Sequence, residues 1–554
     1  MRNQTDHSFR VISLAAALLL LLIAFLPAGR VNAGNAPAAS WALSLDLSSA
    51  NVDSNTVLDT LKASGFDAAL QGGRLTLTGS GSLENLNTLL FDSGVDFLGG
   101  PVELALILPA GSSTLTLKLE TRITSGYAWQ VKSDGNFTLA GESTFEPRYR
   151  AYGAPSIQTL QLSSANGGTA RLVYQRPFDK AEAVTASLSL TLAEPLTTLE
   201  LADPTPSAPV QAEASSLLGE ENPLETLPQG LTLPSKWDWR TKGIVPPVRD
   251  QGGCGSCWAF GTVGVMESAL KKAGGPLKDL SEQFLVSCNK EYWDCGGGLT
   301  AHMYHFNKLG KAQTTVGAVL EAEKPYTASN GTCTIALNHP YKLSNWKFIT
   351  GDEWTVGSVN AIKTAIYTYG PITAGVCALG GFSTYKGGVF SGNDDCGGYT
   401  NHQIILVGWD DATGSWILRN SWGPGWGENG YMRIKYHTAA TPHSRVGEGT
   451  SWVKVTLPIP VLKTPWGKIT DKTPDYKWGA VKNATRYEYR VFKGGATTPL
   501  FTKSALSTAC VNGVCKANPG IKLGLFSYSW QARAYVNGKW QAWSARKLFN
   551  VIAP

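Results

Sequence analysis

The segment of this chain with the clearest candidate nucleophile begins with two cysteines three positions apart. The segment reads Cys254-Gly255-Ser256-Cys257-Trp258, and the apolar residues after it recur at positions 260, 263, 266 and 270. This spacing predicts a helix that begins at Cys257. A thiol at a helix N-terminus faces unsatisfied N–H groups and the positive end of the helix dipole, which favours the thiolate. Cys257 is therefore a candidate nucleophile, and the fold must bring it a base from elsewhere in the chain.

Among the seven histidines, His402 has the sequence context of such a base. It opens the apolar run 403–409, which predicts a buried strand, and a second apolar run, 416–419, then delivers Asn420. His302 and His305 stand one helical turn apart and could hold a metal. No further ligand cluster accompanies them, so we favour a structural role for this pair.

The Cys254-x-x-Cys257 spacing also fits half of a zinc site or a redox pair. No second Cys-x-x-Cys occurs in the sequence, and neither interpretation accounts for the flanking Gln251 and Trp258. We therefore expect a nucleophilic cysteine, with no metal and no cofactor.

Several independent motifs in residues 233–457 resemble those of the papain-like cysteine peptidases. His402 follows Cys257 by 145 positions, inside the range of about 130–150 that this family shows. The matching segments are Gln251-Gly252-Gly253-Cys254-Gly255-Ser256-Cys257-Trp258, Asn420-Ser421-Trp422-Gly423, Gly425-Trp426-Gly427-Glu428-Asn429-Gly430-Tyr431, Leu280-Ser281-Glu282-Gln283 and Trp237-Asp238-Trp239-Arg240. The resemblance implies a two-lobed α+β domain, with a helical lobe and a β lobe.

The resemblance also implies a role for each motif residue. Cys257 would attack a peptide carbonyl, and His402 would pair with the thiolate and later protonate the leaving amine. Asn420 would orient the imidazole, and Trp422 would shield the bond between His402 and Asn420. The Gln251 side chain and the Cys257 N–H would form an oxyanion hole, and each such donor typically contributes about 3 kcal/mol.

The substrate site follows from the same resemblance. The glycines of segment 296–298 would bring backbone groups against an extended peptide, because glycine allows close approach. We expect an uncharged, roomy pocket for the second residue before the cleaved bond, accepting apolar side chains. The substrate-binding residues expected are Gly297, Gly298, Leu299, Thr300, Gly375 and Gln403. No histidine-rich occluding loop is present, which favours endopeptidase action.

The disulfides are expected from the family pattern. Two family bridges would be Cys254–Cys295 and Cys288–Cys333, and Cys510–Cys515 would close a small loop near the C-terminus. The third family bridge lacks its usual cysteine after the asparagine segment, so we expect Cys377–Cys396 instead. Four bridges leave Cys257 free.

Residues 101–200 show period-two alternation with glycine-bearing turns, which predicts an antiparallel β-sandwich. Three of its segments, 124–129, 152–155 and 174–178, resemble those of the chagasin-like inhibitors, immunoglobulin-like domains that block papain-like peptidases with three loops. The match is partial: Arg122-Ile123 replaces an asparagine-proline pair, the second loop is degenerate, and Phe178 replaces a tryptophan. A purely structural sandwich is the alternative. The inhibitory residues implied are Thr124, Gly126, Tyr127, Arg176, Pro177 and Phe178.

The rest of the chain divides by composition. We interpret residues 1–33 as a secretory signal peptide, because basic residues precede an apolar run and the small-residue motif Val31-Asn32-Ala33. Residues 34–100 form a small α+β segment, and residues 201–232 form a linker rich in proline, serine, alanine and glutamate. Residues 458–554 are rich in tryptophan and tyrosine and resemble a fibronectin type III-like β-sandwich. The fold class predicted is thus multidomain, with the α+β domain flanked by all-β immunoglobulin-like sandwiches.

Composition limits the function further. The chain has 554 residues, 48 basic against 42 acidic side chains and no dense basic run, which makes nucleic acid an improbable partner. Nine cysteines suit an oxidising compartment in which eight pair. We predict a secreted, extracellular cysteine endopeptidase that acts on proteins or peptides and is held latent by its own inhibitor-like domain. It could also associate with the cell surface, but without stable membrane insertion after signal cleavage. The alternatives are a transpeptidase or ligase on the same fold and an adhesive protein with a vestigial peptidase domain, and the oligomeric state stays open.

Overall fold

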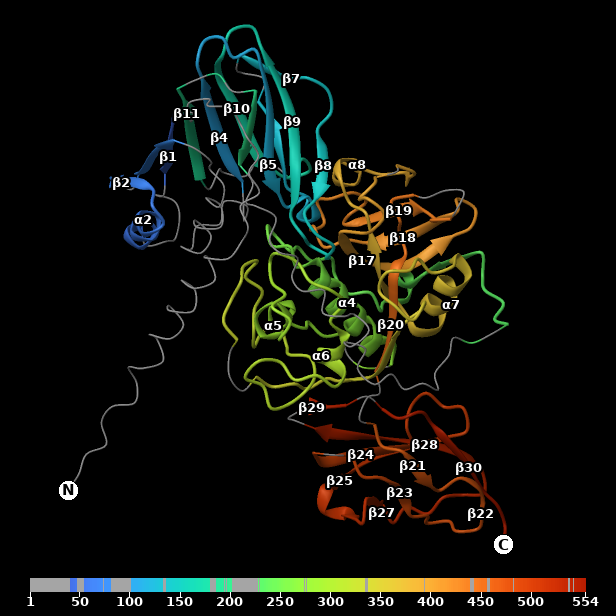
Figure 1. Ribbon diagram of the computed structural model, residues 1–554. Helices are drawn as coiled ribbons and strands as arrows, with labels where there is room; N and C mark the ends of the chain where they lie inside the picture. The colour runs from blue at the N-terminus through green and yellow to red at the C-terminus, as the bar shows by residue number, and fades with distance from the viewer. Residues whose placement is uncertain are drawn as a thin grey trace, which may run out of the picture.

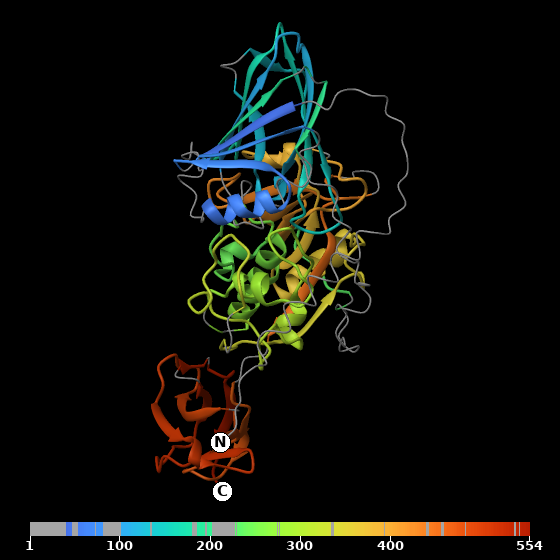
Figure 2. The same ribbon diagram turned by 60° about the vertical axis from the view of Figure 1, so that its left-hand side comes forward.

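The computed structural model forms three bodies in a row, with the N-terminal β-domain and the C-terminal β-domain on opposite sides of a central domain (Figures 1 and 2). The predicted signal peptide and most of the predicted linker lie outside the described residues. The described residues are 40–46, 54–72, 74–80, 101–132, 136–179, 186–193, 195, 197–201, 228, 230–273, 275, 277–333, 337–392, 394–438, 443–455, 459–481, 483–536, 539–541 and 543–554.

The N-terminal β-domain consists of two sheets that share one apolar core. One sheet has the order β2-β3-β1-β11-β4-β10-β6, and the other has the order β12-β5-β9-β7 with β8 added on β9. Alternate leucines such as Leu115, Leu117 and Leu119 fill the core, as the period-two pattern predicts. The elements are β1 (Ser40–Asp46), α2 (Ser54–Ala63), β2 (Asp67–Gln71), β3 (Arg74–Ser80), β4 (Val102–Leu108), β5 (Thr114–Thr121), β6 (Ala128–Val131), β7 (Phe137–Leu139), β8 (Thr144–Pro147), β9 (Ser156–Ser164), β10 (Gly168–Gln175), β11 (Ala186–Leu192) and β12 (Thr198–Leu201).

One boundary differs from the sequence analysis. The segment 34–100 does contain a helix and strands, but its strands do not form a separate unit. Strand β1 pairs antiparallel with β11, so β1, β3 and β2 extend the larger sheet of the N-terminal β-domain. The composition of the segment could not show this, because the pairing joins residues more than 140 positions apart.

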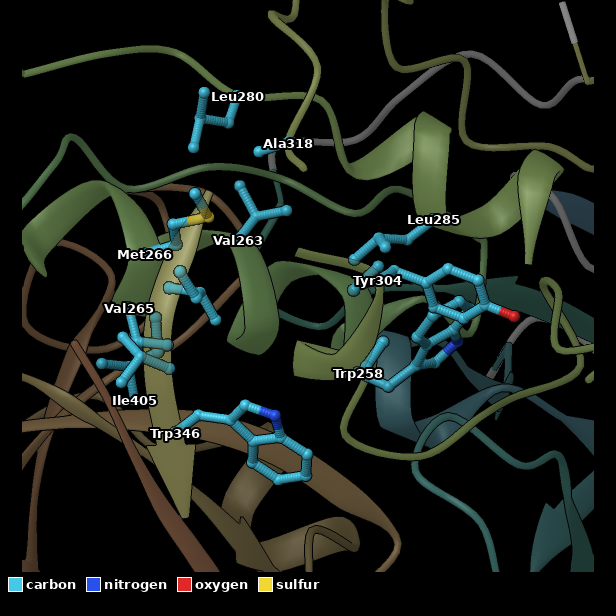
Figure 3. Close-up of a cluster of buried hydrophobic side chains, with 14 of the residues drawn as sticks. Trp258, Val263, Val265, Met266, Leu280, Leu285, Tyr304, Ala318, Trp346 and Ile405 are labelled. Atoms are coloured by element: carbon cyan, nitrogen blue, oxygen red, sulfur yellow. The ribbon is translucent and has the colours of Figure 1, made fainter. Parts of the chain in front are cut away.

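The central domain has a helical side and a β side. Its eight-stranded sheet has the order β14-β20-β15-β17-β18-β19-β16, with β13 paired to β17. Figure 3 shows part of the helical core, where Val263 and Met266 lie beside Leu280 and Ala318. The elements are β13 (Lys236–Asp238), α4 (Cys257–Lys272), α5 (Glu282–Cys288), α6 (His302–Phe306), β14 (Leu343–Phe348), α7 (Val359–Tyr369), β15 (Ile372–Val376), α8 (Gly380–Ser383), β16 (Val389–Phe390), β17 (His402–Asp410), β18 (Ser415–Arg419), β19 (Tyr431–Lys435) and β20 (Glu448–Val455).

The C-terminal β-domain buries most of the aromatic residues that mark its sequence. Trp478, Trp530, Tyr476 and Tyr489 lie in its core, which supports a packing role for them. The fibronectin type III-like assignment stays a prediction, as does the immunoglobulin-like one for the N-terminal β-domain. The elements are β21 (Leu462–Thr464), β22 (Gly467–Ile469), β23 (Tyr476–Gly479), β24 (Ala484–Lys493), β25 (Phe501–Leu506), β26 (Cys510–Val511), β27 (Val514–Ala517), β28 (Ser527–Val536), β29 (Lys539–Trp540) and β30 (Lys547–Val551).

No helix in these described ranges combines the length and the apolar character that a bilayer span requires.

Candidate active site

Cys257 is the first residue of α4, as the apolar spacing predicts. The helix is buried along 257–270 and runs against β17, so its N-terminus is held between the two sides of the central domain. The backbone N–H of Gln403 donates to Cys257 Sγ at 3.5 Å. The thiol therefore lies against the start of β17, beside His402.

The pKa of Cys257 is raised, although a position at a helix N-terminus alone would lower it. Burial raises the pKa of the thiol to about 12, and the backbone N–H groups of Gln403, Trp258 and Cys257 offset this only in part. Burial also lowers the pKa of His402 to about 4, against a smaller opposing effect from Asn420. In this covered arrangement the uncharged thiol and imidazole are favoured over an ion pair.

Asn420 fixes the orientation of the His402 ring. Strand β18 ends at Arg419, so Asn420 follows it directly, and Asn420 Oδ1 lies 2.8 Å from His402 Nε2. The Ser421 N–H also donates to Asn420 Oδ1, which identifies this atom as the amide oxygen. His402 Nε2 must then carry the proton, and Nδ1 keeps its lone pair. Nδ1 is buried and has no hydrogen-bond partner in the described part of the chain.

Gln251 is fully buried beside the cysteine loop. Its Oε1 accepts from the Ser421 hydroxyl at 2.7 Å, so Nε2 points the other way. Nε2 donates to the Cys254 carbonyl at 2.9 Å and to Ser125 Oγ at 3.2 Å. Ser125 belongs to the N-terminal β-domain, so this domain occupies a donor that the family resemblance assigns to the oxyanion hole.

Trp422 packs against the imidazole. The two ring centroids are 5.0 Å apart, and Phe382 contacts both rings. The Trp422 side chain is 1% exposed. Water is thereby kept from the contact between His402 and Asn420.

The cysteines pair as expected from the family pattern. The bridges are Cys254–Cys295, Cys288–Cys333, Cys377–Cys396 and Cys510–Cys515, all within described residues. Cys257 is the free cysteine, and it is buried.

This arrangement predicts the outcome of a thiol titration. Unfolded under non-reducing conditions, the chain should react with one equivalent of Ellman's reagent. Folded and uncut, it should react with less than about a tenth of an equivalent in the same time, because reagent cannot reach a buried thiol. Two or more equivalents in the unfolded chain would contradict the pairing.

The N-terminal β-domain covers this site with three segments. The first is the turn that follows β5. Ser125 Oγ donates to the Cys254 carbonyl at 3.0 Å, and Trp422 Nε1 donates to the Thr124 carbonyl at 2.8 Å. Gly126 is needed here, because a Cβ would lie 3.0 Å from the Phe178 ring and 3.4 Å from the Trp422 ring.

The second segment lies between β8 and β9. Tyr152 forms an antiparallel pair with Gly298, in which each N–H donates to the other's carbonyl at 2.9 Å. The Gly153 N–H donates to the Asn401 carbonyl at 2.8 Å, and the Tyr149 hydroxyl donates to the Gly296 carbonyl at 2.5 Å. The glycine segment 296–298 thus pairs with extended backbone of the same chain, and its binding of a substrate peptide stays a prediction.

The third segment follows β10. The Arg176 guanidinium donates to the Gly252 carbonyl at 3.0 Å, to Asp250 Oδ2 at 2.8 Å and to the Ser125 carbonyl at 2.8 Å. The Phe178 ring stacks on Trp422 with centroids 6.0 Å apart. Arg176 therefore ties the first and third segments to the loop before Cys257.

The structure places two of the six predicted inhibitory residues away from these contacts. Tyr127 packs inside its own domain, stacked on Tyr174, and its ring lies against the Arg176 guanidinium. Pro177 is exposed. Arg122 and Ser125 are contacts that the sequence analysis missed. Arg122 Nη1 donates to the Gly253 carbonyl at 2.9 Å.

The pocket beside Gly298 is not uncharged, which corrects the prediction. Gly375 lies against the Tyr152 side chain that fills this pocket, and Gln403 Nε2 donates to Thr300 Oγ1 at 2.7 Å. Two buried carboxylates accompany them. Glu353 Oε1 accepts from the Thr300 N–H at 2.7 Å, and Glu448 Oε1 accepts from the Thr400 hydroxyl at 3.0 Å.

No sequence signal could have placed these carboxylates. Glu353 lies in a loop and Glu448 opens β20, and neither belongs to a motif. Burial raises the pKa of Glu353 to about 7, with Glu448 adding to the shift and Thr300 opposing it.

The two α6 histidines lie apart from the site. His302 Nε2 lies 3.0 Å from Ser451 Oγ, and burial lowers the pKa of His302 and His305 to about 3. No cluster of three or more potential metal ligands occurs within the described residues.

The central domain is similar in sequence to known proteins of one family. Residues 233–447 match the family described as "Papain family cysteine protease". Germination-specific cysteine protease 1 of Arabidopsis thaliana is 36% identical over 241 residues, which cover 43% of this chain and 60% of that protein. Cysteine proteinase COT44 of Brassica napus is 34% identical over 239 residues, covering 42% of this chain and 68% of that protein.

A solved structure, the Carica candamarcensis cysteine protease CMS1MS2 in complex with E-64, is 32% identical. The alignment covers 40% of this chain and 99% of that one, with a TM-score of 0.34. The chain spans less than two thirds of the length of several curated relatives that it matches. Through its central domain, the chain belongs to the papain family of cysteine proteases.

Proposed function

We propose that this chain is a secreted cysteine endopeptidase that works through Cys257, His402 and Asn420 and is kept latent by its own N-terminal β-domain. One observation carries the proposal: three segments of that domain bind the backbone around Cys257 and His402, where a substrate would have to lie. The four disulfides support export to an oxidising compartment.

The chemistry follows from the orientation of the side chains. His402 Nδ1, with its lone pair, takes the proton of Cys257, and the thiolate attacks the peptide carbonyl carbon. Gln251 Nε2 and the Cys257 N–H would hold the oxyanion. The imidazolium then gives its proton to the leaving amine. Water, activated by His402, hydrolyses the thioester and frees Cys257.

Latency has a steric and an electrostatic part. The steric part is the occupied cleft. The electrostatic part is the burial of Cys257 and His402, which disfavours the thiolate–imidazolium pair while the domain is seated. Removal of the domain would admit water and substrate together, so activation by a cut in the linker 201–232 accounts for both parts.

Arg176 gives a direct test of this proposal. Its side chain is buried in the uncut chain and bridges Ser125, Gly252 and Asp250, so Arg176→Ala removes three charge-assisted hydrogen bonds. We expect the uncut variant to hydrolyse a fluorogenic peptide at least about tenfold faster than the uncut wild type, since such pairs contribute about 2–5 kcal/mol.

The matched control is Arg171→Ala, on the same domain. Arg171 is exposed and pairs with Glu103 on the neighbouring strand, away from the cleft. This variant should stay as latent as the wild type. Cutting the linker should raise the activity of the wild type and of Arg171→Ala, and should add little for Arg176→Ala. An uncut wild type that is already fully active would refute latency.

A further inference from the structure

The C-terminal β-domain carries the positive charge of the chain. Residues 458–554 contain 15 lysine and arginine residues against 3 aspartate and glutamate residues, whereas residues 1–457 contain 33 basic against 39 acidic residues. A domain with such an excess of positive charge attracts polyanions, and the proposed peptidase chemistry does not use it. Which polyanion it suits depends on how the charges are arranged.

Four of these charges form a row on the outer face of the larger sheet of this domain, β22-β30-β28-β24-β25. Residues at alternate positions of β24 and β28 lie on this face, because the residues between them, such as Tyr487 and Ala532, lie in the core. A guanidinium from the segment before β30 completes the row. We call the row the arginine ladder, and it consists of Arg486, Arg533, Arg490 and Arg546.

Aromatic rings separate the guanidiniums of the arginine ladder. The guanidinium carbon of Arg486 lies 4.0 Å from the ring centroid of Tyr535 and 5.4 Å from that of Trp540. The next guanidinium, of Arg533, lies 4.7 Å from the Trp540 centroid and 4.5 Å from the Trp543 centroid. These cation–π contacts fix the guanidiniums in place.

The second half of the ladder repeats this alternation. The guanidinium carbon of Arg490 lies 4.1 Å from the Trp543 centroid and 5.3 Å from the Phe492 centroid. Arg546 ends the row, 3.5 Å from the Phe492 centroid. Because stacking occupies the flat faces of the guanidiniums, their planar N–H edges are the part that a ligand can bind, and their direction is set before it arrives.

The arginine ladder keeps both charge and donors for a ligand. Arg486 and Arg546 are exposed at its two ends. Glu488 accepts from Nε and Nη2 of Arg533, and Arg546 Nη1 donates to the Ala496 carbonyl at 2.9 Å. A guanidinium has five N–H donors, so Arg533 and Arg546 retain others. Four guanidiniums beside Glu488 leave a row with net positive charge.

We infer that the arginine ladder binds a linear acidic polysaccharide, whose carboxylate or sulfate groups pair with successive guanidinium edges. The planar fork of a guanidinium matches anions that accept two parallel hydrogen bonds. A linear polymer with an anion on each repeat matches a row of separate cations. Binding would hold the chain on such a polymer while the central domain, in the same chain, acts on proteins nearby.

The tryptophans of the ladder disfavour two other polyanionic partners. Single-stranded nucleic acid is held largely by bases that stack on open aromatic rings, and membrane-surface segments insert aromatic side chains among the lipid headgroups. Trp540 and Trp543 are part-buried, and each already contacts two guanidiniums. Trp466 is 65% exposed, but it precedes the edge strand β22, which β30 separates from β28. The ladder therefore offers ionic contacts, which suit a polar anionic polymer.

The test uses the uncut full chain and dextran sulfate, with neutral dextran of the same length as the control polymer. Titration calorimetry at low salt should give a Kd at least about 100-fold lower for dextran sulfate, because neutral dextran has no anions for the guanidiniums. Sodium chloride should raise that Kd, since salt screens exposed charges. Equal binding of the two polymers would overturn the inference. So would tighter binding of phosphatidylglycerol vesicles or of oligothymidine, which would assign the ladder to a membrane or a nucleic acid.

Three double variants separate the ladder from the total charge of the domain. Arg486→Gln with Arg546→Gln should raise the Kd for dextran sulfate at least about tenfold, because charged hydrogen bonds are lost. Arg486→Lys with Arg546→Lys keeps the charge but loses the planar forks, and should raise it at least about threefold. The matched control is Lys463→Gln with Lys522→Gln, which removes the same charge at exposed positions outside the ladder and should change the Kd less than about twofold.

Thermal unfolding curves of the variants show whether each still folds. An equal loss of binding in the control pair would mean that the total charge of the domain binds the polymer. Unchanged binding in the lysine pair would mean that the guanidinium forks are not used. Either result would overturn the inference. Since binding is measured on the uncut chain, its outcome is independent of the proposed peptidase function.

Discussion

Alanine in place of Gly153 is expected to make the uncut chain at least about 100-fold more active than the wild type. Gly153 has a φ of +87°, and a Cβ built on it would lie 1.8 Å from the Gly255 carbonyl oxygen. The backbone fixes the position of the Cβ and the Gly255 oxygen is itself a backbone atom, so neither can rotate away, and the second segment must lift out of the cleft. A loss of about 3 kcal/mol in the closed state corresponds to that 100-fold change.

Gly141→Ala is the control for this effect. Gly141 belongs to the same domain and has a φ of +92°, but a Cβ on it would have no atom within 4 Å. Both variants carry the backbone penalty of a left-handed alanine, about 1–2 kcal/mol, and only Gly153→Ala meets the central domain. The rates of peptide hydrolysis by the two uncut variants, compared with their thermal unfolding curves, separate the clash with Gly255 from the backbone penalty that both variants share. Equal activation by both would mean that the contact with Gly255 does not maintain latency.

The local part of the site could be predicted because short-range patterns determine it. The apolar spacing after Cys257 predicts a helix that starts there, and α4 does. The apolar runs predict two strands around His402 and Asn420, and β17 and β18 bring these side chains together. In each case the periodicity of a few neighbouring residues is enough.

The pocket and the second covering segment, which lies between β8 and β9, depend on long-range contacts that local sequence patterns do not predict. Tyr152 contacts Gly298, Gly375 and Gly449. Burial, and then Glu353 and Glu448, raise the pKa of its hydroxyl. These residues come from several loops and from β15 and β20, so their chemistry combines only in the folded chain. For the same reason, the prediction of an uncharged pocket was wrong.

Burial also changes the reactivity of Cys257. The backbone N–H groups at the start of α4 do favour the Cys257 thiolate, but burial of the thiol outweighs them and raises its pKa. Ser125 meanwhile takes up one donor of Gln251. Under the proposed function, Cys257, His402 and Asn420 would be assembled but not reactive in the uncut chain, so the role of Cys257 must be tested in the opened chain.

Cys257→Ala should lower kcat/KM of the opened, linker-cut chain by at least about 10,000-fold, because no other group can form the thioester. The variant should still fold and keep its N-terminal β-domain seated, since the Cys257 side chain makes none of the hydrogen bonds described between the two domains. Its unfolded, non-reduced form should show no titratable thiol, and an epoxide probe that labels the opened wild type should not label it.

The control is the double change Cys510→Ala and Cys515→Ala, which removes a bridge of the C-terminal β-domain. Peptide hydrolysis should stay within about threefold of wild type, because that bridge lies outside the central domain. If the opened Cys257→Ala protein kept more than about a tenth of wild-type activity, Cys257 would not be the nucleophile, and the covered cleft would need another explanation.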